Sequence, residues 1–170
     1  NNLKNDGFSC KTDCDTEVIL RLYERDGING LSLLNGMFAI AIYDKNIDAL
    51  FLIRDRVGEK PLYYSYDGNR LIYGSEIKSL LEVINHKEPN LNAISQYLTF
   101  NYVPPPMTMF EGIKHVMPGT YLKVTRKNIE ELTWWNLADV TSKQKSDSQW
   151  IDEFNSILED AVRIRLRSDV

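Results

Sequence analysis

The chain has 170 residues, of which 43% are hydrophobic and 26% charged, a composition typical of a soluble globular protein with one substantial domain. Its net charge of -4 argues against nucleic acid as a partner, because phosphates favour a basic surface, and no apolar run approaches the roughly 20 residues that span a membrane. Only two cysteines and no amino-terminal apolar segment predict a reducing, cytoplasmic location.

The first element predicted is an amphipathic helix over residues 15–26, in which apolar side chains recur on one face. Gly27 follows as its expected end. Asp13 and Asp15 stand at its start, where short carboxylates cap free backbone N–H groups. A short helical turn is expected at 30–34.

Two hairpins come next. Apolar and β-branched residues predict strands at 37–44 and 49–55, and a second pair at 61–67 and 70–75 is joined by an Asp-Gly turn. The first pair is apolar on both faces. A sheet of this kind has to be covered on both sides.

The remaining elements are two helices, two strands, a linker and a last helix. Helices are predicted at 75–83, capped by Ser75, and at 90–98, capped by Asn90 or Asn92. Residues 99–119 hold four of the six prolines and are expected to be irregular. Strands are expected at 120–125 and 130–137, and a polar linker leads to an amphipathic helix that begins with a capping box of Ser146 and Gln149.

Hairpins with segregated helices define the fold class as α+β rather than alternating βαβ. Two antiparallel sheets between layers of helices would cover both faces of the apolar strands. The chain does not begin with Met, and its last helix is still running near its end, so we expect it to be a piece of a longer protein.

The cysteines and histidines offer little chemistry. A zinc site needs about four ligands and a thioredoxin-like pair has two intervening residues, whereas Cys10 and Cys14 are separated by three residues without a second pair. We interpret both as small packing residues and expect no metal site. His86 and His115 lie in unrelated elements and are interpreted as surface residues without a chemical role.

The charged segment Arg54–Lys60 follows a strand of the buried type. It is either a solvated hairpin loop or a set of partly buried, paired charges that fix backbone geometry or an interface. The charges that follow the strand directly are Arg54, Asp55 and Arg56.

Three stretches carry a family resemblance, and they are "DCDTEVILRLYERDGINGLSLLNGMFAIAIYD", "LFLIRDRVGEKPLYY" and "LIYGSEIKSLL". Together they resemble the glutaminase domain of glutamine-hydrolysing asparagine synthetases, which are class II glutamine amidotransferases. The resemblance covers residues 7–137, and "LEDAVRIRLRSDV" resembles the first helix of the synthetase domain of that family. "KPLYY" and "SEIK" favour the asparagine synthetase branch.

The resemblance implies a four-layer αββα sandwich of the N-terminal-nucleophile hydrolase type, followed by the first helix of an α-helical synthetase domain. It implies a glutaminase domain over residues 1–138 that lacks its amino-terminal part, a linker at 139–147 and the start of the synthetase domain at 148–170. A homodimer is a further expectation.

The resemblance also implies the reaction. An amino-terminal cysteine, whose own α-amine is the general base, attacks the amide of glutamine, an Asn side chain and a backbone N–H hold the oxyanion, and an Arg holds the glutamine carboxylate. All are expected upstream of Asn1. The ammonia released would reach an aspartate activated by ATP and Mg2+ beyond Val170. No catalytic residue, ATP or metal is therefore expected within this piece.

Site residues carried over are few. Asp15 matches the aspartate that binds the α-ammonium of glutamine, whereas the sequence alone favours a helix cap at this position. Met37 matches a position near the ammonia tunnel, although it also suits a strand core. The resemblance assigns Arg54, Asp55 and Arg56 to the tunnel or the domain boundary.

Two alternatives stay open. A relative could amidate another carboxylate, such as a sugar acid, or the chain could belong to a glutaminase-like module without catalysis. A Cys directly after the initiator Met would exclude the second.

Overall fold

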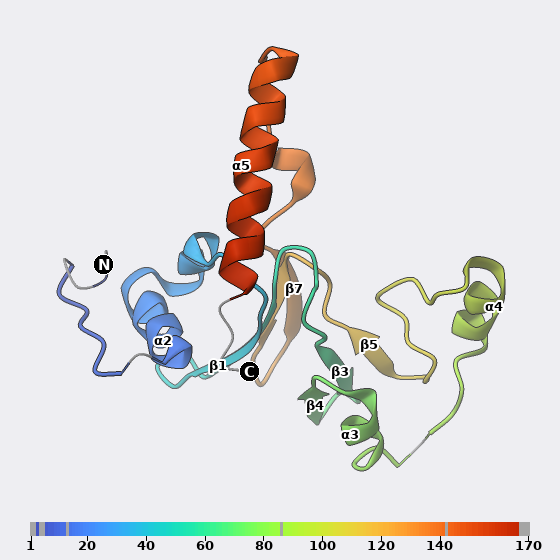
Figure 1. Cartoon of the computed structure of the whole chain (residues 1–170). Helices are drawn as coiled ribbons and strands as arrows, with labels where there is room; N and C mark the ends of the chain where they lie inside the picture. Colours follow the sequence, from blue (N-terminus) through green and yellow to red (C-terminus); the bar gives the residue numbers. More distant parts are fainter. Residues whose placement is uncertain (1–2, 4–5, 13, 86, 142, 167–170) are drawn as a thin grey trace. The chain divides into compact units, whose positions relative to one another are not determined.

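The computed structural model describes residues 3, 6–12, 14–85, 87–141 and 143–166 (Figure 1). The chain divides into two compact units, Asn1–Asn136 and Leu137–Val170. Among the described residues, no helix combines the length and the apolarity needed to cross a membrane.

The first unit is built on two antiparallel sheets. The four-stranded sheet has the order β1-β2-β6-β7, with β1 Ala39–Asp44, β2 Ala49–Arg54, β6 Thr120–Val124 and β7 Ile129–Thr133. The three-stranded sheet has the order β4-β3-β5, with β3 Tyr63–Tyr66, β4 Leu71–Gly74 and β5 Ile113–His115. The predicted α+β class with two hairpins is confirmed.

Strand β5 is the part that the sequence did not predict, because it lies within the proline-rich segment expected to be irregular. It is three residues long, and its pairing partner β3 is about fifty residues away in the chain, with Tyr63 opposite His115. Partners supplied by tertiary contact leave no local pattern of their own.

The four-stranded sheet is covered on both faces, as its apolar strands predicted. Alternate residues of β2 point to opposite sides. Phe51 and Ile53 pack with Tyr23 of helix α2, Asp15–Asp26, whereas Leu52 packs with Leu62 between the two sheets. Leu52 and Ile53 are 0% exposed, so each face of this strand lies in a core.

The far face of the three-stranded sheet carries a further helix. Tyr64 and Leu71 point toward the other sheet. Tyr63, which precedes Tyr64 in β3, points to the opposite face because successive residues of a strand alternate. Gly74 lies on that same face because it pairs with Tyr63. The buried side chain of Leu80 packs close to Gly74. Helix, sheet, sheet and helix therefore follow one another as four layers.

The helices of the first unit are α2 Asp15–Asp26, the 3-10 helix η1 Gly27–Leu33, α3 Ile77–Leu81 and α4 Leu91–Phe100. Asn90 caps α4 through the backbone N–H of Ala93, as predicted. The prediction that Ser75 caps α3 was wrong, because the helix begins two residues later and Glu76 stands at the N-cap.

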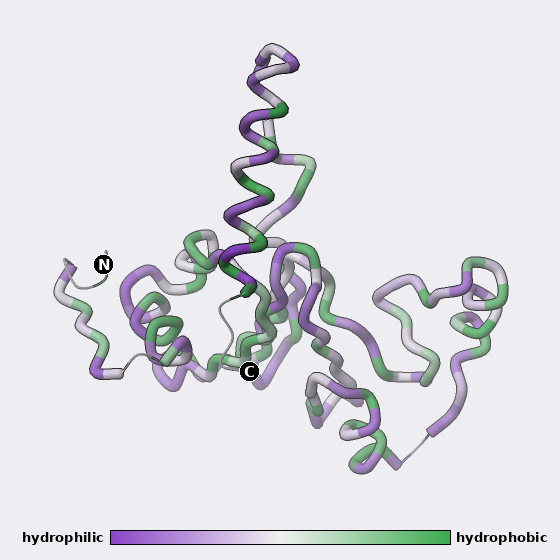
Figure 2. The backbone as a smooth tube through the Cα atoms, viewed as in Figure 1, coloured by the Kyte–Doolittle hydropathy of each residue, from purple (hydrophilic) through white to green (hydrophobic). Residues whose placement is uncertain are grey.

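The second unit contains η2 Leu137–Asp139 and α5 Asp147–Arg165. The predicted capping box is present: the Ser146 side chain accepts the backbone N–H of Gln149, and the Gln149 side chain accepts that of Ser146. Hydrophobic residues recur along α5 between hydrophilic ones (Figure 2). This is the pattern of an amphipathic helix.

Candidate functional site

A pocket of about 720 Å3 runs along β1, one of the two edge strands of its sheet. Its floor is β1 itself, one wall is the amino-terminal half of α2, and a second wall comes from the segments before β3 and α3. The residues that line it are Asp15, Thr16, Ile19, Leu20, Met37, Phe38, Ala39, Ile40, Ala41, Ile42, Tyr43, Lys60, Pro61 and Ser75.

The pocket brings together residues that are far apart in the sequence. Asp15 and Met37, both predicted site residues, line it, and so do Lys60 and Ser75 of the motifs "KPLYY" and "SEIK". The sequence marked those motifs but gave Lys60 no role and Ser75 only that of a helix cap. One anion and one cation over an apolar floor suit a small molecule with an ammonium group and an aliphatic part.

Asp15 is the first residue of α2, and Cys14 is its N-cap. The prediction that Asp15 caps this helix is wrong, because Cys14 and not Asp15 stands at the N-cap; Asp13 lies outside the described residues. Asp15 is exposed, and among the residues described it has no hydrogen-bond or ion-pair partner. Its carboxylate is therefore open to a ligand, while the helix dipole favours a negative charge at this end.

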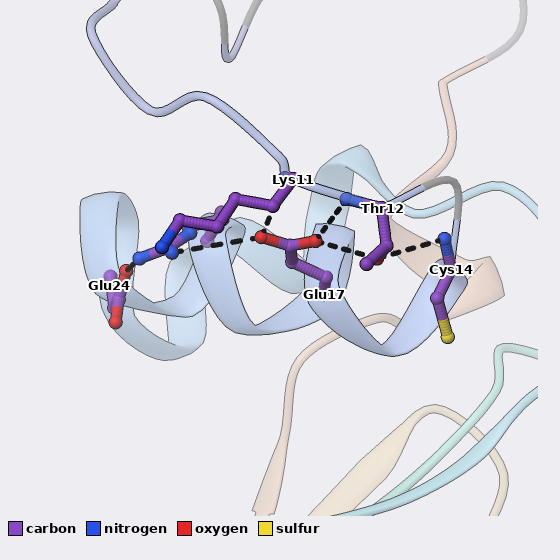
Figure 3. A network of polar contacts seen from close by, with 6 residues as sticks. Lys11, Thr12, Cys14, Glu17 and Glu24 are labelled. Atoms are coloured by element: carbon purple, nitrogen blue, oxygen red, sulfur yellow. Dashed lines mark hydrogen bonds and ion pairs between the residues drawn. The ribbon is translucent and has the colours of Figure 1, made fainter.

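Glu17 fixes the segment ahead of α2 (Figure 3). Its carboxylate accepts the backbone N–H groups of Lys11 and Thr12 at 2.9 and 2.8 Å and the Thr12 hydroxyl at 2.6 Å. Arg21 lies 3.7 Å away, one turn along the helix. The hydrogen bond from the Thr12 side chain, followed by the two from the backbone, lowers the pKa of Glu17 to about 2. This network orients the turn that presents Asp15.

The opposite wall depends on Asp55, which is 1% exposed. Its Oδ2 accepts the N–H groups of Phe38 and Lys60 at 3.2 and 2.9 Å, and its Oδ1 accepts those of Val57 and Glu59 at 3.2 and 2.9 Å. Burial raises the pKa of this carboxyl, but the hydrogen bonds from backbone N–H groups, led by that of Lys60, outweigh burial and hold the pKa below its usual value.

Arg54 is buried beside Asp55, and its guanidinium donates hydrogen bonds to backbone carbonyl oxygens. It donates to Lys60 at 2.9 Å, to Gly58 at 2.8 Å and to Val116 at 2.8 Å. Burial lowers the pKa of this arginine. The interpretation of buried charges that fix backbone geometry is thus the right one for Arg54 and Asp55.

Arg56 connects its own segment with the end of η1 and with Trp134, which follows β7. It donates to the carbonyl oxygens of Leu34 and Ser32 at 2.7 and 2.9 Å, and its guanidinium lies 5.5 Å from the centre of the Trp134 ring. None of Arg54, Asp55 and Arg56 lines the pocket. Their assignment to a tunnel or a domain boundary stays a prediction.

Gly58 is required by the packing around Arg54. Its φ is +71°, a conformation that favours glycine, and an added Cβ would lie 2.8 Å from Cγ of Pro118 and 3.0 Å from Cζ of Arg54. The glycine therefore lets the loop close over the guanidinium.

The interpretation of the cysteines as packing residues was wrong for Cys14, which is exposed, and Cys10 is half-buried; both are free thiols. A hydrogen bond with the Thr16 side chain lowers the pKa of the Cys14 thiol. In the described parts of the chain, no three His, Cys, Asp or Glu residues are grouped as a metal site would require.

The histidines also differ from their interpretation as surface residues. His86 lies outside the described residues. His115 is half-buried in β5, with its ring 4.6 Å from that of Tyr63. Burial lowers its pKa, and the nearby charge of Arg54 lowers it further, so this imidazole is a neutral packing group.

Comparison with known proteins assigns the class. The model of the glutamine amidotransferase domain matches residues 1–135. The fold agrees: the structure titled as the allosteric regulatory enzyme of purine biosynthesis aligns with a TM-score of 0.52 at 22% identity, over 79% of this chain and 25% of that one. The chain belongs to the glutamine amidotransferase domain family.

Two curated relatives are more similar in sequence. A putative glutamine-hydrolysing asparagine synthetase of Methanocaldococcus jannaschii is 37% identical over 94% of this chain and 32% of its own length. A glutamine-hydrolysing asparagine synthetase of Bacillus subtilis is 34% identical over 96% of this chain and 26% of its own length. The chain thus spans about a quarter to a third of the relatives it matches.

Proposed function

We propose that the chain forms the glutamine site of a glutamine-dependent asparagine synthetase. The observation that carries this proposal is the pocket along β1, because it presents the carboxylate of Asp15, which has no partner among the described residues, within a domain of the glutamine amidotransferase family. In the intact protein, glutamine would be hydrolysed to glutamate, and its ammonia would be transferred to aspartate.

Asp15 would bind the α-ammonium of glutamine. A carboxylate that accepts charge-assisted hydrogen bonds from an ammonium group contributes about 1.5–3 kcal/mol to binding. Its support is twofold: the side chain has no competing partner among the described residues, and the Glu17 network holds the preceding turn in place.

Met37 would line the path of ammonia. It borders the same pocket as Asp15 and is 45% exposed. An apolar wall favours neutral NH3 over NH4+, because burying an ion is costly. Arg54 and Asp55 would hold the backbone of the Lys60–Pro61 wall rather than touch the ligand, and Arg56 would lie at the domain boundary.

The remaining machinery would lie outside this piece. We assign residues 1–138 to the glutaminase domain, 139–147 to a linker and 148–170 to the start of the synthetase domain. The nucleophilic cysteine would precede Asn1, and ATP, Mg2+ and aspartate would bind beyond Val170. A homodimer in the cytoplasm completes the proposal.

The test uses the intact protein supplied with glutamine, aspartate, ATP and Mg2+. We expect glutamate and asparagine to form together, and the 170-residue piece alone to release no glutamate. Glutamate release with transfer to a sugar acid but not to aspartate would contradict the acceptor. No glutamate release under any condition would contradict the glutaminase itself and favour a non-catalytic module.

A further inference from the structure

Two segments form walls at one end of the pocket, Met37–Phe38 and Lys60–Pro61. Each donates one backbone N–H group to the same oxygen atom of Asp55. Oδ2 of Asp55 accepts the N–H of Phe38, which follows Met37, and the N–H of Lys60, which precedes Pro61. All four of these wall residues line the pocket. The other oxygen, Oδ1, accepts the N–H groups of Val57 and Glu59, within the loop itself.

The main chain of Asp55 reinforces the same connection. Its N–H donates to the carbonyl oxygen of Phe38 at 3.0 Å, and its own carbonyl accepts the N–H of Gly119 at 2.9 Å. Phe38 is therefore bound through both its N–H and its C=O, which leaves the Met37–Phe38 wall little freedom to shift relative to Asp55.

The Lys60 wall is held equally firmly. Its N–H binds Asp55 and its C=O accepts Nε of Arg54 at 2.9 Å. Lys60 is exposed, so the buried pair fixes its backbone while its side chain borders the pocket.

We propose that Asp55 is a positioning residue that sets the separation of the Met37–Phe38 and Lys60–Pro61 walls, and thereby the fit of the pocket to glutamine. The inference rests on the proposed function for the identity of the ligand. The geometry requires a carboxylate: two oxygens offer about four acceptor sites, and four N–H groups fill them.

The variant that tests this role is Asp55→Asn in the intact protein. The amide keeps the shape but replaces one oxygen by an NH2 group, which cannot accept the two N–H groups that face it. We expect the KM for glutamine to rise at least tenfold, while activity with ammonium salts in place of glutamine stays within twofold of the unaltered protein.

The matched control is Asp67→Asn. Asp67 also accepts two backbone N–H groups, those of Asn69 and Arg70, but neither of these donors lines the pocket, unlike Phe38 and Lys60. Its KM for glutamine should not change. A folded Asp55→Asn protein with an unchanged KM, or with equal losses of glutamine- and ammonia-dependent activity, would overturn the inference.

Hydrogen exchange tests the link between Phe38 and Lys60 through Asp55, and it needs neither an activity assay nor the Asp55→Asn protein. In the unaltered protein we expect the amides of Phe38 and Lys60 to be protected at least 100-fold and to open together, because one oxygen holds both. Exchange of the two amides at unrelated rates would overturn the inference even if Asp55→Asn fails to fold. Failure of the proposed function would instead appear as no glutamate release by the unaltered protein, with the paired protection intact.

Discussion

Two charged segments border the pocket, and they use their charges in opposite ways. In the Arg54–Lys60 segment, the carboxylate of Asp55 and the guanidinium of Arg54 are buried and form hydrogen bonds with backbone groups. At the start of α2, Glu17 binds the preceding turn in the same manner, but Asp15 next to it is exposed. The charges of the first segment therefore hold the backbone in place. In the second segment Glu17 has that task, and the charge of Asp15 remains available.

The comparison teaches how to separate structural charges from ligand-binding ones. A buried charge whose donors or acceptors are all engaged has nothing left to offer a ligand. A charge with no partner, on a backbone that its neighbours hold in place, is available to a ligand without reorganisation. By this criterion we assign Asp15 to the proposed glutamine site and Asp55 to its support.

The largest effect is expected for Asp55→Ala. Removal of the carboxylate leaves four backbone N–H groups without their acceptor, and the free energy of unfolding should fall by about 3–5 kcal/mol. Urea denaturation measures this loss. Asp67→Ala, in an exposed turn, should cost much less, and equal losses for the two variants would remove the distinction between the segments.

A smaller loss is expected for Gly58→Ala, about 2 kcal/mol or more, because the new Cβ meets Pro118 and Arg54 and the residue has a positive φ. Gly68→Ala is the matched control, since Gly68 has φ +98° but open space around its Cβ position. It should lose only about 1 kcal/mol. Equal losses would mean that contact with the guanidinium of Arg54 contributes nothing.

The smallest effect concerns the pH dependence of the turn before α2. Because the pKa of Glu17 falls from an ordinary 4.5 to about 2 on folding, its contribution is fully present above pH 4.5 and is lost as the pH falls toward 2. An NMR titration of the Glu17 carboxyl should give a midpoint near 2, and Thr12→Val should raise it. A midpoint near 4.5 in the unaltered protein would contradict the network.

Much of this arrangement was accessible from the sequence. The hairpins, the helix over Asp15–Asp26 and the capping box before α5 have local patterns, and the structure has them at nearly the predicted bounds. Strand β5 was missed because its order comes from pairing with β3, and that pairing leaves no periodicity in a three-residue strand.

The site was predictable only in part. The sequence and its family resemblance singled out Asp15 and Met37, which line one pocket. They could not distinguish a helix cap from a carboxylate that has no partner in the described part of the chain. The reason is that capping depends on φ and ψ at Cys14 and on which N–H groups the Glu17 carboxylate accepts. The role of Asp55 likewise required knowledge of which N–H groups converge on it.

The account is tested most directly by the KM for glutamine of Asp15→Asn in the intact protein, with Asp147→Asn as the control. Both aspartates are first residues of a helix, so the pair separates ligand binding from the loss of a charge at a helix start. We expect Asp15→Asn to raise the KM at least about tenfold, as the loss of a charge-assisted hydrogen bond predicts, and to leave ammonia-dependent activity and the melting temperature unchanged. An unchanged KM for glutamine would contradict the account.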